Sequence, residues 1–308
     1  MISSAGRRAL YTWERRGKKI GWSVIRAVFI LGFAFVILYS PIGMLARAFM
    51  SPQDLYDSSV LWLPKHFTFT NIEIAAKAMH YGRAFWNSFW TSTLSTLLQL
   101  FSCIAAGYAF ARYRFPLRRL MFVCVLLTLI VPPQLTMISS YMYMSDLSLI
   151  GSLWPMMLMS ATGMGIRSGL FIYMFRQFFT SMPKETEEAA MVDGAGHFRI
   201  FLEVMLPGAL TVIVTVALFS FVWQWNDVFF VNLYDRAFGS LSNSVTGAGF
   251  AEVFRNYPAY SAFSQFDPII TKNFQSTAAL MAVMPLILLF VVMQRYFVES
   301  VERSGVVG

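Results

Sequence analysis

Six long apolar runs constrain the fold of this chain more than any other feature of its sequence. A helix that crosses a bilayer needs about 20 mostly apolar residues. The runs of that length are residues 27–48, 87–110, 118–140, 152–174, 206–226 and 276–297. Charged residues make up 13% of the 308 residues, against roughly a quarter in soluble domains. The sequence therefore predicts an all-α membrane protein with six transmembrane helices.

The apolar pattern divides the chain into three parts. We expect residues 1–26 to form a basic leader, residues 27–300 a transmembrane domain and residues 301–308 a short tail. The run after the leader is longer than the apolar core of a signal peptide, so we expect it to remain as a transmembrane helix. Prolines inside several runs predict kinked helices in a bundle. Whether the break at Pro132-Pro133 serves gating or packing stays open.

Lysine and arginine placement predicts the orientation of these helices. Most of the 24 basic residues lie in the leader, in the short loop ARYRFPLRR (residues 111–119) and in other segments on the same predicted side. Basic residues favour the cytoplasmic side of a membrane, so both termini are expected there. The net charge of +8 is then a topology signal, and it gives no reason to expect a nucleic-acid partner.

The loop between the fourth and fifth runs differs from the rest of the chain in its acidic, small-residue composition. It contains EEAAMVDGAGHFRIFLEVMLP, residues 187–207. Ser181 and Pro183 are typical of a helix start, and Gly194 is typical of a helix end. Apolar residues at helical spacing after the glycine predict a second short helix. The pattern predicts a helix–glycine turn–helix segment over residues 181–207, parallel to the membrane on its cytoplasmic side.

Two interpretations of this loop follow from its side chains. Its small residues would let another protein's backbone approach closely, and a flanking carboxylate such as Glu188 could pair with a cation on that partner. Alternatively, the loop is amphipathic and rests on the lipid headgroups. Interfacial helices usually carry lysine or arginine on the polar face, whereas this loop is acidic.

The same loop carries a resemblance to a known family. Glu188-Ala189-Ala190, followed by Gly194 and by Val204-Met205-Leu206-Pro207, resembles the EAA motif of ABC importer permeases. The family usually has isoleucine where Val204 stands. The flanking segments FRQFFTSMPKE, FVWQWNDVFF and MPLILLFVVMQRYFVESV resemble the carbohydrate-uptake branch, which includes maltose and glycerol-phosphate permeases. The resemblance extends over residues 65–300.

The resemblance implies a type I permease bundle in the bacterial cytoplasmic membrane that imports sugars or oligosaccharides. A second, homologous permease, two ATPase subunits and an extracytoplasmic solute-binding protein would complete the importer. ATP and magnesium would bind to the ATPase partners, and no cofactor is expected in this chain. Another small polar solute, such as glycerol phosphate, is an alternative substrate. An ion-coupled secondary transporter is an alternative of a different class, although such proteins use internal repeats that this sequence does not show.

The resemblance also assigns the ATPase contact to particular residues. They are Glu187, Glu188, Ala189, Ala190, Asp193, Gly194, Ala195 and Pro207. Glu188 would pair with a basic residue of the ATPase, the small residues would provide the close fit, and Asp193 would brace the turn.

The sequence offers no catalytic or metal-binding set. The nucleotide-binding pattern G-x-x-x-x-G-K-[ST] is absent. The three histidines, His66, His80 and His197, lie far apart, and the cysteines Cys103 and Cys124 fall within apolar runs. We therefore expect a subunit that is not an enzyme and that binds no metal.

Five residues are candidates for a translocation path: Arg167, Trp223, Trp225, Asn226 and Asp227. An ionisable residue inside a span is a functional candidate, so Arg167 could face a cavity and touch substrate. It could instead pair with Asp227 or lie nearer the outer interface. WQWND could stack on sugar or form an interfacial aromatic belt. The outer loop 227–275 could contact the binding protein or cover the bundle.

Overall fold

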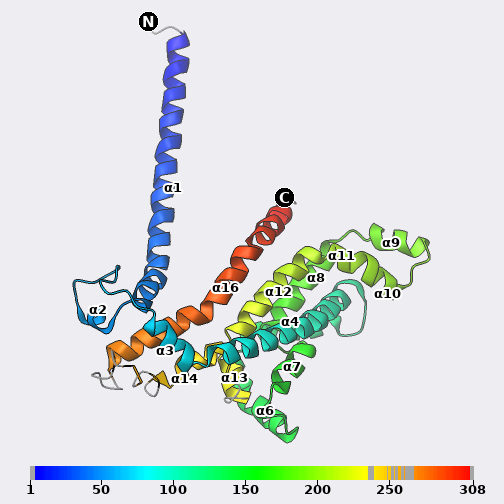
Figure 1. Ribbon diagram of the computed structural model, residues 1–308. Helices are drawn as coiled ribbons and strands as arrows, with labels where there is room; N and C mark the ends of the chain where they lie inside the picture. The colour runs from blue at the N-terminus through cyan, green and yellow to red at the C-terminus, as the bar shows by residue number, and fades with distance from the viewer. Residues whose placement is uncertain are drawn as a thin grey trace. The chain divides into compact units, whose positions relative to one another are not determined.

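The computed structural model describes residues 4–234, 239–247, 249–250, 253, 256–257, 260 and 267–305 (Figure 1). The first residues of the predicted leader, parts of the predicted outer loop 227–275 and the end of the predicted tail lie outside these ranges. Within them the secondary structure is helical, with one isolated bridge between Met50 and Phe67 and no named strand. The all-α prediction is confirmed. The chain divides into two compact units, one of Met1–Ala75 with Phe254–Leu280 and one of Ala76–Val253 with Met281–Gly308.

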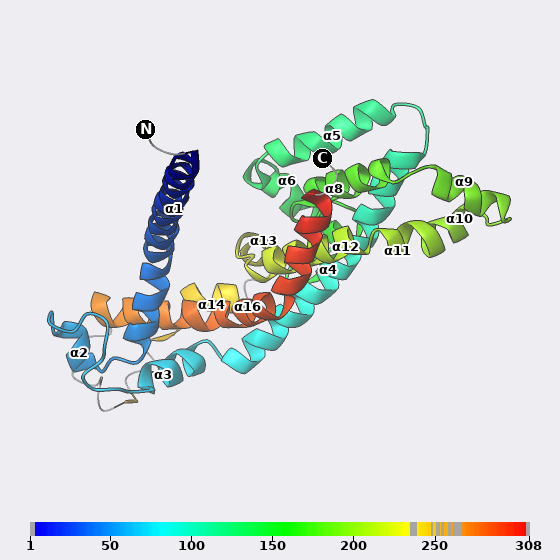
Figure 2. The same cartoon turned by 90° about the horizontal axis from the view of Figure 1, so that it is seen from above.

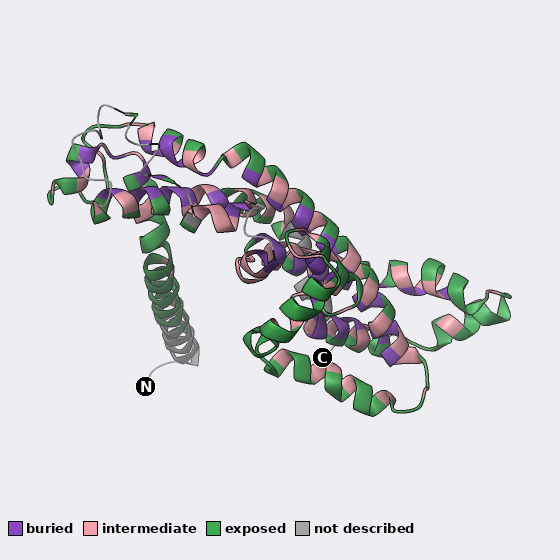
Figure 3. Cartoon of the chain, turned by 90° about the horizontal axis from the view of Figure 1, so that it is seen from below, coloured by how far each residue is buried: buried purple, intermediate pink, exposed green. Residues whose placement is uncertain are grey.

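The first unit contains a long exposed helix and a small folded segment after it. The helices are α1 (Ser4–Ala48), α2 (Pro52–Tyr56), most of α3 (Thr70–Ala78) and the start of α16 (Pro268–Gly305). The apolar part of α1 is exposed along its length (Figure 3), as expected of a helix that faces lipid. Beyond it, the Asn71 amide donates to the carbonyls of Ala48 (3.1 Å) and Met50 (2.7 Å) and so fixes the chain where α1 ends.

The second unit is built around α4 (Tyr81–Arg112), which packs against α8 (Ser168–Ser181), α12 (Leu210–Trp225) and α7 (Trp154–Ala161). Its apolar core includes Cys103, Phe171, Phe175, Phe179 and Val216, all fully buried. The remaining helices are α5 (Arg118–Ile130), α6 (Pro133–Asp146), α9 (Glu185–Val192), α10 (His197–Ile200), the π-helix η1 (Phe201–Met205), α11 (Leu206–Gly208), α13 (Phe229–Tyr234) and α14 (Leu241–Gly247).

Close helix contacts at α8 depend on two glycines. A Cβ atom on Gly107 of α4 would lie 2.5 Å from the Cβ of Phe175. A Cβ on Gly169 of α8 would lie 2.4 Å from the hydroxyl of Thr128 on α5. Small residues allow membrane helices to approach this closely, so α8 is held between α4 and α5.

The six predicted spans are reproduced only in part. Among the described residues, Gly21–Ala48, Tyr81–Arg112 and Pro268–Gln294 are each long and apolar enough to cross a membrane. Two bent pairs could each count as one more span: Arg118–Ile130 with Pro133–Asp146, at 105°, and His197–Gly208 with Leu210–Trp225, at 74°. The chain thus has three to five candidate spans, and the count of six and the cytoplasmic termini stay predictions.

The predicted third span is broken at the expected prolines, whereas the break in the fourth span was not predicted. The predicted span 118–140 breaks at Val131 and Pro132, since neither Pro132 nor Pro133 has an amide hydrogen to continue the helix. The predicted span 152–174 divides into α7 and α8, because the chain between them passes through left-handed backbone at Gly163 (φ 73°) and Arg167 (φ 60°).

Candidate functional site

The acidic loop folds as a helix, a glycine turn and a second helix. Helix α9 ends at Val192, and Gly194, two residues further on, has a φ of 82°, in the left-handed region. The amide of Gly194 donates to the carbonyl of Met191 (3.0 Å), and the amide of Ala195 donates to the carbonyl of Ala190 (3.0 Å). This pair of bonds is the Schellman motif, which favours glycine at the position that Gly194 occupies. Helices α9 and α10 project beyond the ends of α4, α8 and α11 (Figure 2).

One face of the loop is open to the surroundings. We call it the loop surface and define it by the exposed residues Glu188, Ala189, Met191, Val192 and Asp193. Val192 is 88% exposed and Met191 44% exposed. Gly194 is exposed as well, whereas Ala190 and Ala195 are half-buried. Sequence reasoning missed Met191 and Val192, although two apolar residues in an otherwise polar segment were a readable signal for a contact surface.

Glu187 points into the protein, unlike its neighbour Glu188. Its carboxylate lies 2.5 Å from the Nε of Arg112 in a close ion pair. The side chains of Arg112 and Glu187 are only 8% and 12% exposed. Arg112 also donates through its second terminal nitrogen to the carbonyl of Met182 (2.9 Å). The structure therefore places Glu187 in an internal contact, and sequence reasoning gave Arg112 only a role in topology.

The chain returns from the loop to the core through η1. Ile200 and Met205 are buried, and the ring of Phe201 lies 4.8 Å from that of Tyr108 on α4. Pro207 is exposed and sits in the first turn of α11, beside the 74° bend that leads into α12. Because a proline cannot donate a backbone hydrogen bond, it favours such an irregular passage. Pro207 thus belongs to the bend and not to the loop surface.

The candidates for a translocation path fall into separate environments. Arg167 is exposed, and its guanidinium carbon lies 5.7 Å from the ring centre of Trp223, as in a cation–π contact. Trp223 in turn stacks on Phe171 (5.4 Å) and Phe219 (5.8 Å). Arg167 and one aromatic residue of WQWND are therefore brought together.

Trp225, Asn226 and Asp227 have other contacts. Trp225 is buried and donates its indole hydrogen to the carbonyl of Ala282 (3.1 Å), while Asn226 is exposed and bonds to the carbonyl of Val222. Asp227 accepts from the amides of Phe230 and Val231 (3.3 Å each) at the start of α13. No ion pair between Arg167 and Asp227 occurs in the described part of the chain.

A buried polar cluster at the middle of α4 was not predicted. Gln99 is fully buried and donates to the carbonyl of Ile166 and to the hydroxyl of Ser168, both at 2.7 Å. Its carbonyl accepts from Ser220 (2.6 Å) and from the side chain of Gln224 (3.4 Å). These bonds join α4 to α8 and α12.

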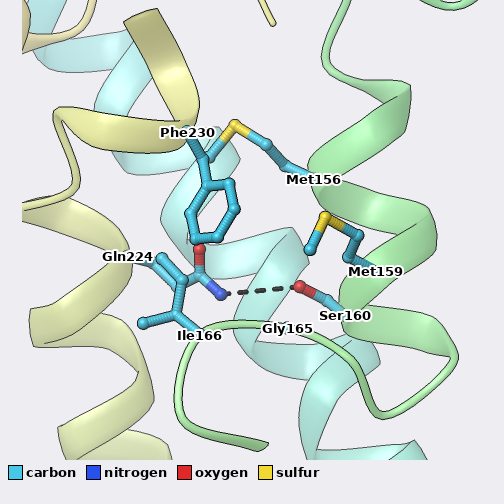
Figure 4. A pocket seen from close by; sticks show the side chains of 7 residues that line it. All are labelled: Met156, Met159, Ser160, Gly165, Ile166, Gln224 and Phe230. Atoms are coloured by element: carbon cyan, nitrogen blue, oxygen red, sulfur yellow. Dashed lines mark hydrogen bonds between the residues drawn. The ribbon is translucent and has the colours of Figure 1, made fainter. Parts of the chain in front are cut away.

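A cavity of about 10 Å³ lies beside this cluster (Figure 4). It is lined by Met156, Met159, Ser160, Gly165, Ile166, Gln224 and Phe230. The Gln224 amide reaches the Ser160 hydroxyl across it, at 3.5 Å. A space of this size holds about one water molecule, so this part of the bundle is closed to a sugar in the present conformation.

Comparisons with known proteins agree with this architecture. The osmoprotective compounds uptake permease protein GgtD of Synechocystis sp. is 31% identical over 211 residues, which cover 67% of this chain and 70% of that protein. The diacetylchitobiose uptake system permease protein DasC of Streptomyces coelicolor is 28% identical over 287 residues, covering 93% and 96%.

Another relative and one solved structure match most of the chain. The sn-glycerol-3-phosphate transport system permease protein UgpE of Yersinia pestis is 24% identical over 300 residues, covering 94% of this chain and 98% of that protein. A chain of a bacterial ABC transporter involved in the import of the acidic polysaccharide alginate has the same fold, with a TM-score of 0.72 and 21% identity over 92% of this chain and 98% of that one.

The family model described as "Binding-protein-dependent transport system inner membrane component" matches residues 100–303. This range includes the acidic loop, Arg112 and all five path candidates, and Gln99 lies one residue before its start. The chain therefore belongs to the binding-protein-dependent transport system inner membrane components, the permease subunits of ABC importers.

Proposed function

We propose that this chain couples a separate ATPase to the import of sugars or oligosaccharides, and that the ATPase docks on the loop surface. The observation that carries the proposal is the exposed acidic and small-residue face of α9, which is held at the ends of α4 and α8. A partner bound to this face can displace or rotate α4 and α8, to whose ends α9 is attached. The resemblance of the segment around Glu188 to the EAA motif gives the same location.

Glu188 is suited to the contact with the partner. It is exposed, and in the described part of the chain no cation lies within ion-pair distance of it. Its neighbour Ala189 leaves room for another backbone, and Val192 offers apolar area that a partner would bury. A charged group of the ATPase would meet Glu188 beside a dry contact, where an ion pair is stronger than at an open surface.

The proposed assembly follows the family. A second permease, two ATPase subunits that bind ATP and magnesium, and an extracytoplasmic binding protein surround this chain. Both termini and the loop lie on the cytoplasmic side. Arg167 and Trp223 form part of the wall of the translocation path, because an exposed guanidinium beside an aromatic face offers both hydrogen bonds and a stacking surface to a polyol.

The name of one relative also favours a second class of substrate, a phosphate ester. The relative UgpE is named for sn-glycerol-3-phosphate, whereas DasC is named for diacetylchitobiose. The assembled importer in liposomes, supplied with its binding protein, separates the two classes by uptake of labelled oligosaccharide and of labelled glycerol 3-phosphate. Uptake of the oligosaccharide alone supports the main proposal, and uptake of the phosphate ester alone overturns its substrate.

The charge reversal Glu188→Lys tests the coupling role. We expect the complex in liposomes to assemble and to transport at least about tenfold less substrate for each ATP hydrolysed, within the range of typical coupling free energies. Glu203→Lys is the matched control, since Glu203 is an exposed glutamate of the same segment outside the loop surface. An unchanged ratio in Glu188→Lys would remove the docking role of the loop surface.

A further inference from the structure

A buried cation lies where three helices of the second unit end or begin. Arg112 is the last residue of α4, α8 ends at Ser181, and α9 begins at Glu185. The guanidinium of Arg112 reaches the Met182 carbonyl just beyond α8 and the Glu187 carboxylate in the first turn of α9. One side chain therefore contacts all three elements.

The burial of this pair makes the contact specific. Removing one partner of a buried ion pair leaves an uncompensated charge, which is strongly unfavourable. Arginine suits the position because its planar group carries five donors and can hold a carbonyl and a carboxylate together. Adjacent residues of a helix point about 100° apart, so Glu187 can face Arg112 while Glu188 faces outward on the loop surface.

The two ends of the loop are attached differently. The C-terminal end of the loop, which leads into α11, is held by apolar packing of Ile200, Phe201 and Met205 against the core. The end that follows α8 is held by Arg112 through an ion pair and a hydrogen bond. Apolar packing is non-directional, whereas the ion pair and the hydrogen bond of Arg112 tie the first turn of α9 and the end of α8 to the end of α4.

We infer that Arg112 and Glu187 form the mechanical link that carries movement of α9 to α4 and α8. This inference rests on the proposed function and adds the positioning residues through which the ATPase acts. Glu187 then serves inside the permease and not in the ATPase contact. The link explains how a small displacement at the loop surface is transmitted to a helix of 32 residues.

The experiment compares substrate transported per ATP hydrolysed by the full complex in liposomes. We expect Arg112→Met and Glu187→Gln each to lower this ratio by about tenfold, the scale of typical coupling free energies, while the ATPase stays bound. Arg112→Lys keeps the charge without the fork and is expected to lie between Arg112→Met and the unchanged protein. The exchange Arg112→Glu with Glu187→Arg is expected to recover part of the ratio, because it restores the pair.

Arg199→Met is the matched control. Arg199 pairs with Glu203 at 2.8 Å in the same segment, but the two side chains are 67% and 60% exposed. Its loss is expected to leave the transport ratio unchanged. If the role of Arg112 were purely structural, Arg112→Met would reduce assembly and thermal stability. The complexes that still assemble would then transport as much substrate per ATP hydrolysed as the unchanged protein.

The outcomes separate this inference from the proposed function. If Glu188→Lys uncouples the complex and Arg112→Met leaves the ratio unchanged, the link is wrong and the docking surface stands. If Glu188→Lys has no effect, the proposed function fails. If Arg112→Met, Arg112→Lys and the exchanged pair all fail to assemble, Arg112 is a folding residue only and the inference is overturned.

Discussion

Helix α4 makes polar contacts with α8 at two levels, and the levels differ in charge. At its middle, the neutral side chain of Gln99 bonds to Ile166 and Ser168, next to the first turn of α8. At its end, the charged side chain of Arg112 holds the Met182 carbonyl and Glu187. Charges are costly inside a membrane, so ionic contacts are expected at helix ends and neutral ones within the bundle. The difference indicates that Gln99 fixes helix packing, whereas Arg112 links the bundle to the loop.

Among changes that remove no charge, the largest expected loss of stability comes from Gln99→Leu. The change would leave the buried groups of Ser168, Ser220 and Ile166 without their partner, and we expect a loss of about 3 kcal/mol. The midpoint of thermal unfolding of the purified complex measures it. The control Gln177→Leu alters an exposed glutamine of α8 and should have little effect. If the assembled Gln99→Leu complex loses transport per ATP, the two levels of α4 do not have separate roles.

A smaller loss of stability is expected from Gly107→Ala, which lies between the two levels. The added Cβ would lie 2.5 Å from that of Phe175 and 3.0 Å from the amide nitrogen of Arg176, and overpacking of this kind costs about 1–3 kcal/mol. Gly82→Ala is the matched control on the same helix, because nothing lies within 4 Å of its new Cβ. Equal melting midpoints for the two variants would show that α8 can move away from α4 without cost.

The smallest loss of stability is expected from Arg199→Met. This change tests whether an ion pair in this segment must be buried, like that of Arg112, to contribute strongly. The exposed pair with Glu203 is expected to contribute about 0.5 kcal/mol or less. Thermal unfolding of this variant beside Arg112→Met compares an exposed pair with a buried one in the same segment. A loss as large as that of Arg112→Met would show that burial does not set the strength of the contact.

Local signals in the sequence predicted much of the loop and part of the bundle. Gly194 predicted the end of α9, because a left-handed residue after a helix favours glycine. Pro132-Pro133 predicted the break that separates α5 from α6. The break before α8 was missed, since Gly163 and Arg167 lie in a run that is apolar on average. Periodicity says nothing about which turns of two helices meet, and for that reason the pairing of Arg112 with Glu187 had no sequence signal.

Polar residues within a span offered a signal that was not used. Gln99, Ser220 and Gln224 all lie in predicted transmembrane runs, where buried polar groups need partners. Because each of these side chains requires a hydrogen-bond partner, a contact among them could have been predicted, and the structure contains one. The contacts of Trp225 and Asp227 could not be predicted in this way, because an aromatic residue and a carboxylate at a helix end fit several environments equally well.

The most direct test of the central claim is photo-cross-linking from the loop surface in the assembled, nucleotide-loaded importer. A photo-reactive amino acid in place of Val192, which is 88% exposed, is compared with the same group in place of Leu63, which is 84% exposed. Leu63 lies between the first two predicted spans, on the side of the membrane opposite to the predicted cytoplasmic termini. The account predicts a covalent adduct with the ATPase from position 192 and none from position 63. An ATPase adduct from position 63, or none from position 192, would contradict it.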